Sequence, residues 1–317
     1  MIDRASLERH QVWAYLAAIA TGLALGASAP AVAPVFEAVL WPVLGALLYA
    51  TFTQVPLVHL EAALRDGRFV AAVLGGNFLA APLLVAALLP LVPDDPAVRL
   101  GVVLVLVVPC TDWFITFTHL ARGDTARAIA VAPLVLLAQL VLLPVYVWLL
   151  VGGDVTAEVP LAHVATAFGA LIVVPLALAW WTERRAERHG RALIDRLAWA
   201  PVPLLALVVF LIAASQVGAV TRALPLLAEV SAAFVLYLAA ALALGVALTR
   251  AAGLPARVGR TLTFSLGTRN SFVVLPLALA LPTAWQAASI VIVLQSLVEL
   301  FGMLAFLRLV PRLLPEP

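Results

Sequence analysis

Residues 98–120 read VRLGVVLVLVVPCTDWFITFTHL, an apolar stretch interrupted near its middle by the polar run PCTD at 109–112. Residues 258–281 read VGRTLTFSLGTRNSFVVLPLALAL and carry a similar interruption, GTRN at 267–270, about 157 positions later. Proline removes a backbone donor and disfavours helical geometry at the preceding residue, and glycine adds flexibility. We therefore predict two membrane helices with matched breaks, centred on Pro109 and Gly267.

The composition of the chain indicates that lipid is its solvent. It has 317 residues, of which 64% are hydrophobic and only 11% charged, and its mean hydropathy is +1.11. A soluble domain carries roughly a quarter charged residues, and a single water-facing core stops growing near 250–300 residues. Cys110 is the only cysteine, so an intrachain disulfide and a paired-cysteine metal site are excluded.

The apolar stretches predict an all-α multi-pass membrane protein of about ten transmembrane helices, because a spanning helix needs about 20 mainly apolar residues. We expect the N-terminal stretch to be the first span and not a cleavable signal, since no small-residue cleavage site follows it. The ten predicted spans are about 11–29, 35–55, 69–92, 98–120, 126–151, 161–182, 198–218, 227–249, 258–281 and 285–309.

The basic residues, all of them arginine, predict the orientation of the chain. With the N-terminus in the cytoplasm, sixteen of the 19 fall in inside segments, only Arg99 and Arg222 fall outside, and Arg269 lies within a span. This bias predicts that both termini are cytoplasmic, in a bacterial inner membrane. The arginines lie in short loops and not on one face, which excludes a nucleic-acid partner. Lipid is the partner that the sequence predicts, and it leaves the oligomeric state open.

The two halves of the chain resemble each other. Besides the matched breaks, Gln139 in the fifth span and Gln295 in the tenth are 156 residues apart. Five helices per copy is an odd number, so the second copy must enter the membrane from the opposite side. We predict two inverted five-helix repeats, residues 1–155 and 156–317, whose broken helices meet at a binding site near the midplane.

Three ionisable residues, Asp112, Arg269 and Glu299, lie near the middle of predicted spans. A charge at the bilayer centre costs about 2.5–3.5 kcal/mol on insertion scales, so such residues usually face a cavity or a partner. We expect Asp112 and Arg269 to form a pair that contacts solute or opens when Asp112 is protonated. A static ion pair between crossing helices is the alternative. Glu299 and Asp112 are candidates for proton coupling.

Other polar residues are candidates to line the same cavity. Glu299 and Gln295 are four apart and share a helix face. Asn77 and Gln139 either line the cavity or hydrogen-bond neighbouring helices. Thr111 and Asn270 flank the charged positions in the two breaks, where we expect substrate binding. Cys110 is either a small apolar filler or a soft ligand that contacts a thiophilic solute transiently.

The Pro109-Cys110-Thr111 run in a broken span, followed by HLARGD at 119–124, resembles the arsenical-resistance permeases of the yeast type. Those permeases belong to the bile acid:sodium symporter superfamily. Further residues that fit the pattern are Asn77, Phe78, Pro82, Asn270, Gln295, Val298 and Glu299. The resemblance implies a core domain and a panel domain, with helices 4 and 9 crossing in the core. It also implies functional importance for Cys110 and Glu299.

What the resemblance implies is proton-coupled efflux of arsenite, and of its antimony analogue, without a cofactor. Two features differ from typical arsenite permeases: Asp112-Trp113 follow the cysteine motif, and Arg269 stands in the second break. They keep a second reading open, a symporter for a small organic anion that binds Arg269. Arg269 also argues against a sodium ion bound at the ninth-span position that helps to bind sodium in the bile acid symporters. Two unit positive charges 4 Å apart repel each other by about 4 kcal/mol at an effective dielectric of 20. No enzyme motif such as HExxH or GxSxG is present.

Overall fold

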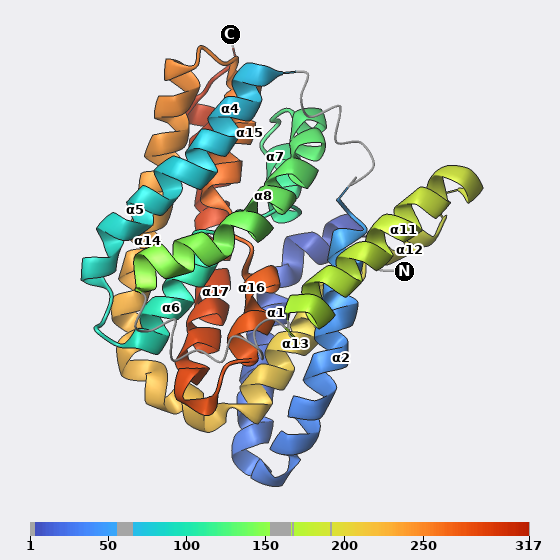
Figure 1. Ribbon diagram of the computed structural model, residues 1–317, viewed down its shortest axis with the longest axis vertical. Coiled ribbons are helices and arrows are strands. Elements are labelled where there is room, and N and C mark those ends of the chain that lie inside the picture. The colour runs from blue at the N-terminus through green and yellow to red at the C-terminus, as the bar shows by residue number, and fades with distance from the viewer. Residues whose placement is uncertain (1–3, 56–65, 153–165, 167, 191, 317) are drawn as a thin grey trace. The chain divides into compact units, whose positions relative to one another are not determined.

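The computed structural model of the chain describes residues 4–55, 66–152, 166, 168–190 and 192–316. Within them the regular elements are helices, joined by short turns (Figure 1). The exception is an isolated antiparallel bridge between Pro109 and Arg269. The prediction of an all-helical fold is confirmed for this part of the chain.

Five helices of the described residues are long and apolar enough to cross a membrane: Pro30–Phe52, Gly67–Leu91, Thr125–Val151, Ala228–Ala251 and Thr283–Leu313. Three shorter apolar helices are Trp13–Ser28, Pro96–Leu106 and Pro201–Ser215. Each of these eight helices overlaps one of the predicted spans. The helical content is therefore that of a multi-pass membrane protein, and the number of ten spans stays a prediction.

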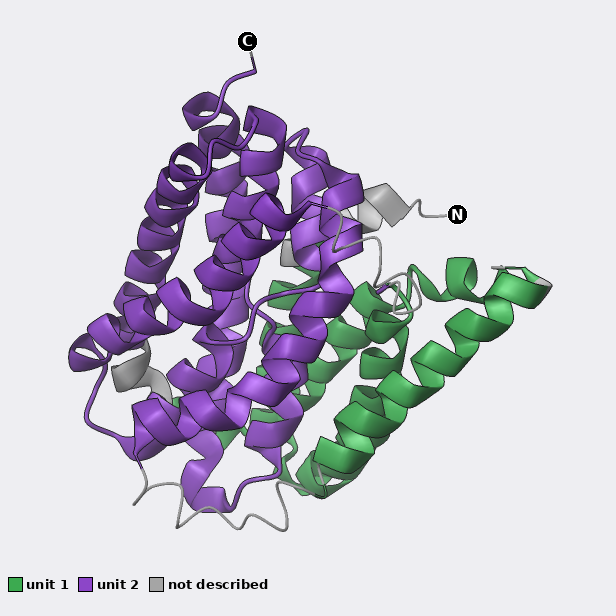
Figure 2. Ribbon diagram, turned by 45° about the horizontal axis from the view of Figure 1, so that its top comes forward, with its two compact units in different colours: residues 1–54, 161–225 green, residues 55–160, 226–317 purple. Residues whose placement is uncertain are grey.

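The chain divides into two compact units, and each takes segments from both predicted repeats (Figure 2). Unit 1 comprises Met1–Gln54 and Leu161–Pro225, and unit 2 comprises Val55–Pro160 and Leu226–Pro317. A division by contacts does not test repeats that are defined along the sequence, so the repeats 1–155 and 156–317 remain a prediction.

Unit 1 is a layer of helices in which α13 packs against both α1 and α2, and α11 packs against α2. Gly22 and Gly26, one turn apart on α1, allow the close approach of α13, because a Cβ at either would come within 3.0 Å of its backbone. The elements of unit 1 are α1 Arg4–Ser28, η1 Pro30–Val32, α2 Ala33–Phe52, η5 Gly169–Val173, α11 Val174–His189, α12 Ala192–Leu197 and α13 Pro201–Ser215.

Unit 2 holds both broken helices. The first consists of α6 Pro96–Leu106 and α7 Trp113–Leu120, and the second of α15 Ala256–Gly267 and α16 Ser271–Leu279. The two non-helical segments fall at the predicted breaks. The other elements of the unit are α4 Gly67–Gly75, η3 Gly76–Ala80, α5 Ala81–Leu88, η4 Leu89–Leu91, α8 Thr125–Val151, η6 Thr283–Trp285, α17 Gln286–Leu313 and, from Leu226 onward, α14 Val217–Ala251.

Helices α14 and α11 are among those that extend beyond the predicted spans. Helix α14 begins at Val217, so the loop expected between 218 and 227 is helical. Pro225 lies in this segment, but a proline removes only one helical donor, which a long helix tolerates. Helix α11 continues past the predicted end at 182 to His189 and so carries part of the charged segment. The start of the span predicted at 161–182 lies outside the described residues.

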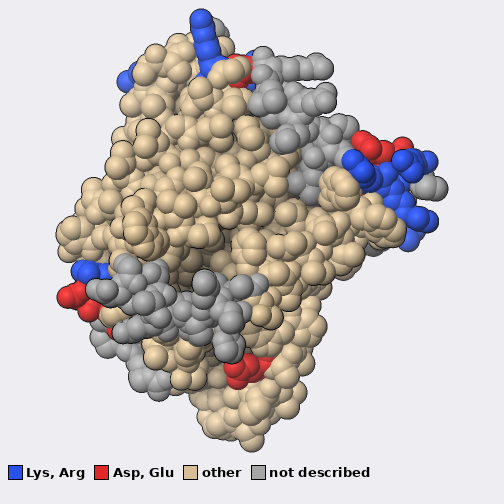
Figure 3. All heavy atoms as spheres, in the orientation of Figure 1, with Lys and Arg blue, Asp and Glu red and all other residues tan. Residues whose placement is uncertain are grey.

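Apolar side chains cover the surface, while polar ones are buried. On α8, Val141 is 72% exposed and Gln139 is 1% exposed. The face shown in Figure 3 is almost entirely uncharged, and its charged side chains gather in a few places. This distribution is the reverse of a water-soluble surface and is typical of helices that face lipid.

Candidate functional site

The two helix breaks of unit 2 pair with each other through their backbones. The N–H of Asn270 donates to the carbonyl of Val108 at 2.7 Å, and the N–H of Cys110 donates to the carbonyl of Thr268 at 3.2 Å. These bonds flank the antiparallel bridge between Pro109 and Arg269. The crossing therefore satisfies backbone groups that a break in a membrane helix would otherwise leave unpaired.

Gly267 serves this crossing through its size. It is the last residue of α15 and its backbone is not in the left-handed region. A Cβ at this position would lie 2.5 Å from the ring of Phe306 on α17 and 3.1 Å from Met303. The sequence predicted conformational freedom at Gly267, whereas the structure uses its lack of a side chain to pack α15 against α17.

The guanidinium of Arg269 is buried and donates to neutral oxygens from three segments. Nη1 donates to the carbonyl of Leu106 at 3.2 Å, and Nη2 donates to the carbonyls of Ser265 and Leu266 at 3.0 and 2.8 Å. Nη2 also donates to Oδ1 of Asn77 at 2.8 Å. The expected direct partner, Asp112, is not among the acceptors of these bonds, so the Asp112–Arg269 pair remains a hypothesis.

Asn77 and Tyr237 complete the surroundings of Arg269. Asn77 lies in η3, a π-helical turn, and its Nδ2 donates to the Ser265 hydroxyl at 2.9 Å. Tyr237 lies on α14 with its ring centroid 5.4 Å from the guanidinium carbon of Arg269, and its hydroxyl donates to the carbonyl of Leu266 at 3.2 Å. Asn77 is thus used for helix-to-helix bonding, one of the two roles left open for it.

Glu299 on α17 contacts the crossing through one of its two carboxylate oxygens. Oε2 accepts from the backbone N–H of Arg269 at 2.9 Å and from Nε2 of Gln295 at 2.7 Å. The Gln295 side chain accepts in turn from the Ser271 hydroxyl at 2.7 Å. The other oxygen, Oε1, is buried and has no partner among the described residues. Glu299 therefore has one structural oxygen and one that is available to a proton or a solute.

The Cys110 thiol is buried in the first break and donates to Oδ1 of Asp112 at 2.9 Å. Asp112 precedes α7 and does not cap it through its side chain. The Thr111 hydroxyl between them is fully buried and has no hydrogen-bond partner among the described residues. A soft donor thus lies beside a carboxylate, with a free hydroxyl adjacent in the chain.

Asn270 begins the second half of the other broken helix. Its Oδ1 accepts from the N–H of Val273 at 3.3 Å and so caps α16, while its buried Nδ2 has no partner in the described part of the chain. Gln139 on α8 is also buried, and neither end of its amide is bonded to another described residue. An unbonded buried amide is costly in a membrane protein unless a ligand or water satisfies it.

Most of the residues predicted for the site are joined in one network of unit 2. Bonds or bridge contacts connect Pro109, Cys110, Asp112, Asn270, Arg269, Asn77, Gln295 and Glu299. Gln139 and Thr111 are buried without bonds to it. Sequence reasoning missed Ser265, Ser271 and Tyr237. A hydroxyl one helical turn before Arg269 was the available signal for Ser265, but hydroxyl residues are common in membrane helices.

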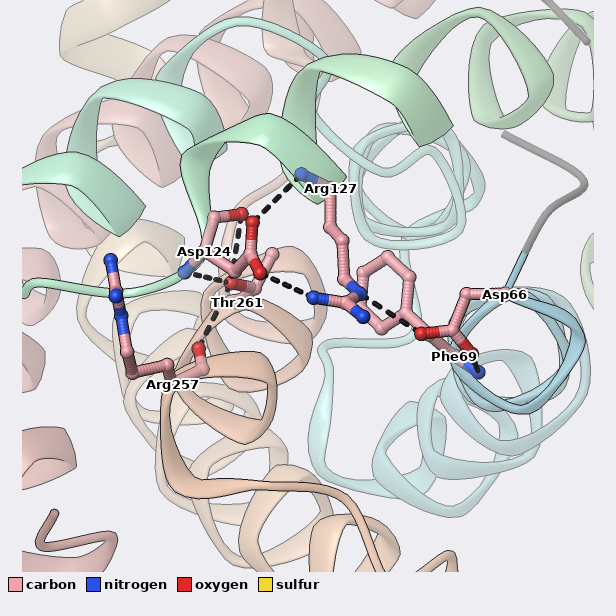
Figure 4. A network of polar contacts seen from close by, with 6 residues as sticks. All are labelled: Asp66, Phe69, Asp124, Arg127, Arg257 and Thr261. Carbon is pink, nitrogen blue, oxygen red and sulfur yellow. Dashed lines mark hydrogen bonds and ion pairs between the residues drawn. The ribbon is translucent and has the colours of Figure 1, made fainter. Parts of the chain in front are cut away.

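A second polar network joins the first turns of three helices of the same unit, α4, α8 and α15 (Figure 4). Arg127, in the first turn of α8, donates to Asp66 at 2.9 Å and forms a short ion pair with Asp124. Asp66 and Asp124 cap α4 and α8 by accepting from backbone N–H groups. The N–H of Asp124 donates to the Thr261 hydroxyl at 2.8 Å and to the carbonyl of Arg257.

This network brings together segments that the arginine count assigns to one side of the membrane. Near it, Arg260 donates to the carbonyls of Ala121 and Leu314 at 3.2 and 3.1 Å. The start of α4, the α7–α8 turn, the start of α15 and the end of α17 therefore lie at one end of unit 2. The predicted division of the arginines between the two sides of the membrane requires these segments to lie together. That this end of unit 2 faces the cytoplasm stays a prediction.

The carboxylates of the second network are held in their charged form. The backbone N–H of Phe69 and the side chain of Arg127 lower the pKa of Asp66 below its usual value, although burial opposes them. Burial alone would raise the pKa of Asp124, but its bonds to the backbone and guanidinium of Arg127 outweigh it and lower the pKa. Both caps are therefore ionised at neutral pH.

The site is suited to a small solute. No cluster of three His, Cys, Asp or Glu residues able to hold a metal ion occurs among the described residues. Among the described residues, the unbonded side-chain atoms in and beside the breaks are a carboxylate oxygen of Glu299, the Thr111 hydroxyl, the amide nitrogen of Asn270 and Nε of Arg269, close to the Cys110 thiol. Such a set can meet a neutral polyhydroxyl solute from several sides without holding it tightly.

The sequence matches the model of one protein family, described as Sodium Bile acid symporter family, over residues 41–223. The matched part includes the first break with Cys110 and Asp112, and it ends before Arg269 and Glu299. Among curated proteins, none matches the sequence.

Proposed function

The chain belongs to the Sodium Bile acid symporter family, and we propose that it exports trivalent arsenic hydroxide, and the antimony analogue, in exchange for protons. Members of this family are transporters and not enzymes, and its apolar helices make the chain a multi-pass membrane protein. The proposal places it in a bacterial inner membrane with both termini in the cytoplasm, as the arginine distribution predicts.

The observation that carries the proposal is the buried Cys110 thiol bonded to Asp112 in a non-helical segment. In the proposed step the thiol sulfur bonds to arsenic as one As–O bond breaks, and the thiol proton leaves with the hydroxyl as water. The reverse step releases the solute. A single thiol permits release, whereas several thiolates would retain the metalloid.

The proposal assigns proton handling to Asp112 and Glu299. Asp112 accepts the thiol hydrogen bond, so it is positioned to relay the thiol proton to the departing hydroxyl, which leaves as water, when sulfur bonds to arsenic. Glu299 leaves Oε1 without a partner in the described residues, which gives a proton a place to bind without breaking the Oε2 contacts. Thr111 and Asn270 supply neutral groups for the hydroxyls of the solute.

The bonds around Arg269 support the inverted repeats that belong to this proposal. The bridge partners Pro109 and Arg269 are 160 positions apart. The same offset relates Leu106 to Leu266, whose carbonyls both accept from the Arg269 guanidinium. It also relates Asn77 to Tyr237, which contact that guanidinium through an amide oxygen and through a ring face. A two-fold axis that passes through the bridge would relate the two residues of each pair.

The test is metalloid tolerance in an efflux-deficient bacterium that expresses the wild-type chain or Cys110→Ser. The serine keeps a hydroxyl donor for Asp112 but removes the soft ligand, so we expect equal protein in the membrane and lost tolerance to arsenite. In everted vesicles, an imposed pH gradient should drive arsenite accumulation by the wild type only. Full tolerance in the serine variant would rule out the thiol contact.

The family match favours a second candidate, a symporter for a small organic anion. The N-termini of α7 and α16 would meet its carboxylate through their backbone N–H groups. The four bonds of the Arg269 guanidinium to neutral oxygens make that side chain a weaker anion site than the sequence predicted. Saturable uptake of cholate or a smaller carboxylate, with no change in metalloid tolerance, would select this candidate.

A further inference from the structure

The guanidinium of Arg269 lies in an environment that is unusual for a buried charge. The side chain is 2% exposed, and the oxygens that it donates to are three backbone carbonyls and one amide oxygen. Glu299 accepts from the backbone N–H of Arg269, and its carboxylate also interacts with the charge of Arg269. A buried charge normally requires an opposite charge or very strong polar contacts, and here every hydrogen bond of the guanidinium is supplied by the neutral oxygen cage.

The helix ends explain why this cage attracts a cation. Leu106 is the last residue of α6, and Ser265 and Leu266 lie in the last turn of α15. Both helices thus direct free carbonyls and the negative ends of their dipoles at the same place. Asn77 adds a fourth neutral oxygen, and the face of the Tyr237 ring adds a cation–π contact. These features would favour a monovalent cation whether or not it is attached to the chain.

We propose that this oxygen cage is a monovalent-cation site that the Arg269 guanidinium occupies permanently, so that the transport cycle needs no dissociable sodium ion. The tethered cation neutralises the two converging helix ends and keeps the crossing assembled in every state. A free cation that entered the cage would have to displace the guanidinium and would meet its charge. This inference concerns the cation and holds for either solute considered above.

The experiment empties the cage and supplies a free cation. In purified Arg269→Ala, the thermal midpoint should lie several degrees below that of the wild type in choline chloride. Guanidinium chloride at low millimolar concentration should raise it in a saturable way, and sodium chloride should do so more weakly. The thermal midpoint of the wild type should be the same in guanidinium, sodium and choline chloride at matched ionic strength. Arg269→Lys, which keeps a tethered cation, should fold without the additive.

Arg260→Ala is the matched control. Arg260 is also buried and also donates to backbone carbonyls, but it reaches Glu316, whose side chain is 48% exposed. Its removal should lower the thermal midpoint without a cation-specific recovery. The proposal is wrong if Arg269→Ala shows the same shift in guanidinium, sodium and choline. It is equally wrong if wild-type transport in vesicles stops when choline replaces sodium, a readout that does not require the variant to fold.

Failure here is distinguishable from failure of the proposed export function. Arsenite tolerance that depends on Cys110 but also on external sodium would retain the export function and reject the occupied cage. Guanidinium-specific recovery in a protein that confers no metalloid tolerance would retain the cage and reject arsenite as the solute.

Discussion

Pro109 and Arg269 lie opposite each other in the antiparallel pairing of the two helix breaks, and both backbone bonds of the pairing are made by their neighbours. At such a position each N–H points away from the partner strand. Pro109 has none, whereas the N–H of Arg269 donates to Glu299. The crossing is therefore asymmetric in its chemistry, because only the second break requires an acceptor from the last long helix.

Two substitutions of Glu299 should distinguish the structural role of its bonded oxygen, Oε2, from the proposed proton-binding role of its unbonded oxygen, Oε1. Glu299→Ala leaves the N–H of Arg269 and the amide of Gln295 without their acceptor, which costs about 1–3 kcal/mol for each buried donor. Glu299→Gln retains an acceptor oxygen, so we expect a thermal midpoint close to that of the wild type. It cannot carry a proton, so solute transport by this variant should no longer respond to an imposed pH gradient. Retained gradient dependence would remove Glu299 from proton coupling.

Replacing Asn77 with leucine should destabilise unit 2. The change removes the Oδ1 acceptor of a buried guanidinium and the donor to Ser265, with an expected cost of about 1.5–3 kcal/mol because one partner is charged. Thermal unfolding in detergent measures it. Thr21→Val on α1 is the control, because that exposed hydroxyl bonds only within its own helix, and it should change stability by less than about 0.5 kcal/mol.

Replacement by alanine should have opposite effects on stability at two of the glycines. A Cβ at Gly245 on α14 would lie 2.7 Å from the Cα of Thr263 on α15, so Gly245→Ala must separate the two helices. We expect a loss of about 1–3 kcal/mol. Gly75 has no neighbour within 4 Å of the same position, and Gly75→Ala should be neutral or stabilising by up to about 1 kcal/mol. Equal midpoints for the two variants would contradict the close α14–α15 approach.

The ion pair of Asp124 and Arg127 should make stability depend on pH in the acid range. The folded pKa of Asp124 is lowered, so its contribution is complete above the unfolded pKa, near 4, and is lost as pH falls through the folded value. Asp124→Asn keeps the helix cap but not the charge. The midpoint of the wild type should exceed that of the variant at pH 7, by an equivalent of less than about 1 kcal/mol, and the two should converge in acid.

Asp195→Asn provides the control for this pH experiment, since Asp195 is exposed on α12 in unit 1. It should leave the dependence of the midpoint on pH unchanged. A constant difference between the wild type and Asp124→Asn from pH 7 down to pH 3 would show that the charge of Asp124 does not contribute.

The positions of the helix breaks could be predicted from sequence because their causes are local. Pro109 cannot donate to a helix, and a polar run in an apolar stretch is visible without coordinates. The contacts of Arg269 could not be predicted in this way. Its acceptors come from α6, η3 and α15, and their convergence depends on how those helices end in three dimensions. The nearest carboxylate in the sequence pattern, Asp112, was the simplest partner to expect.

The register between the two halves shows a second limit of the sequence. Matching similar residues relates Gln139 to Gln295 at 156 positions, whereas the bridge pairs Pro109 with Arg269, which are 160 positions apart. Under the axis proposed above, an offset of 160 would relate Gln139 to Glu299. Residue similarity alone does not fix such an offset, because backbone pairing relates positions and not residue types.

Because main-chain atoms bond Val108 to Asn270 and Cys110 to Thr268, a side chain that makes no bond across the crossing, such as that of Thr111, can be exchanged without dismantling the scaffold. On the proposed site assignment, mutation at Thr111 or Asp112 would alter which solute is accepted, while Val108 and Asn270 remain joined through carbonyl and amide. A protein built in this way separates the evolution of its selectivity from the preservation of its architecture.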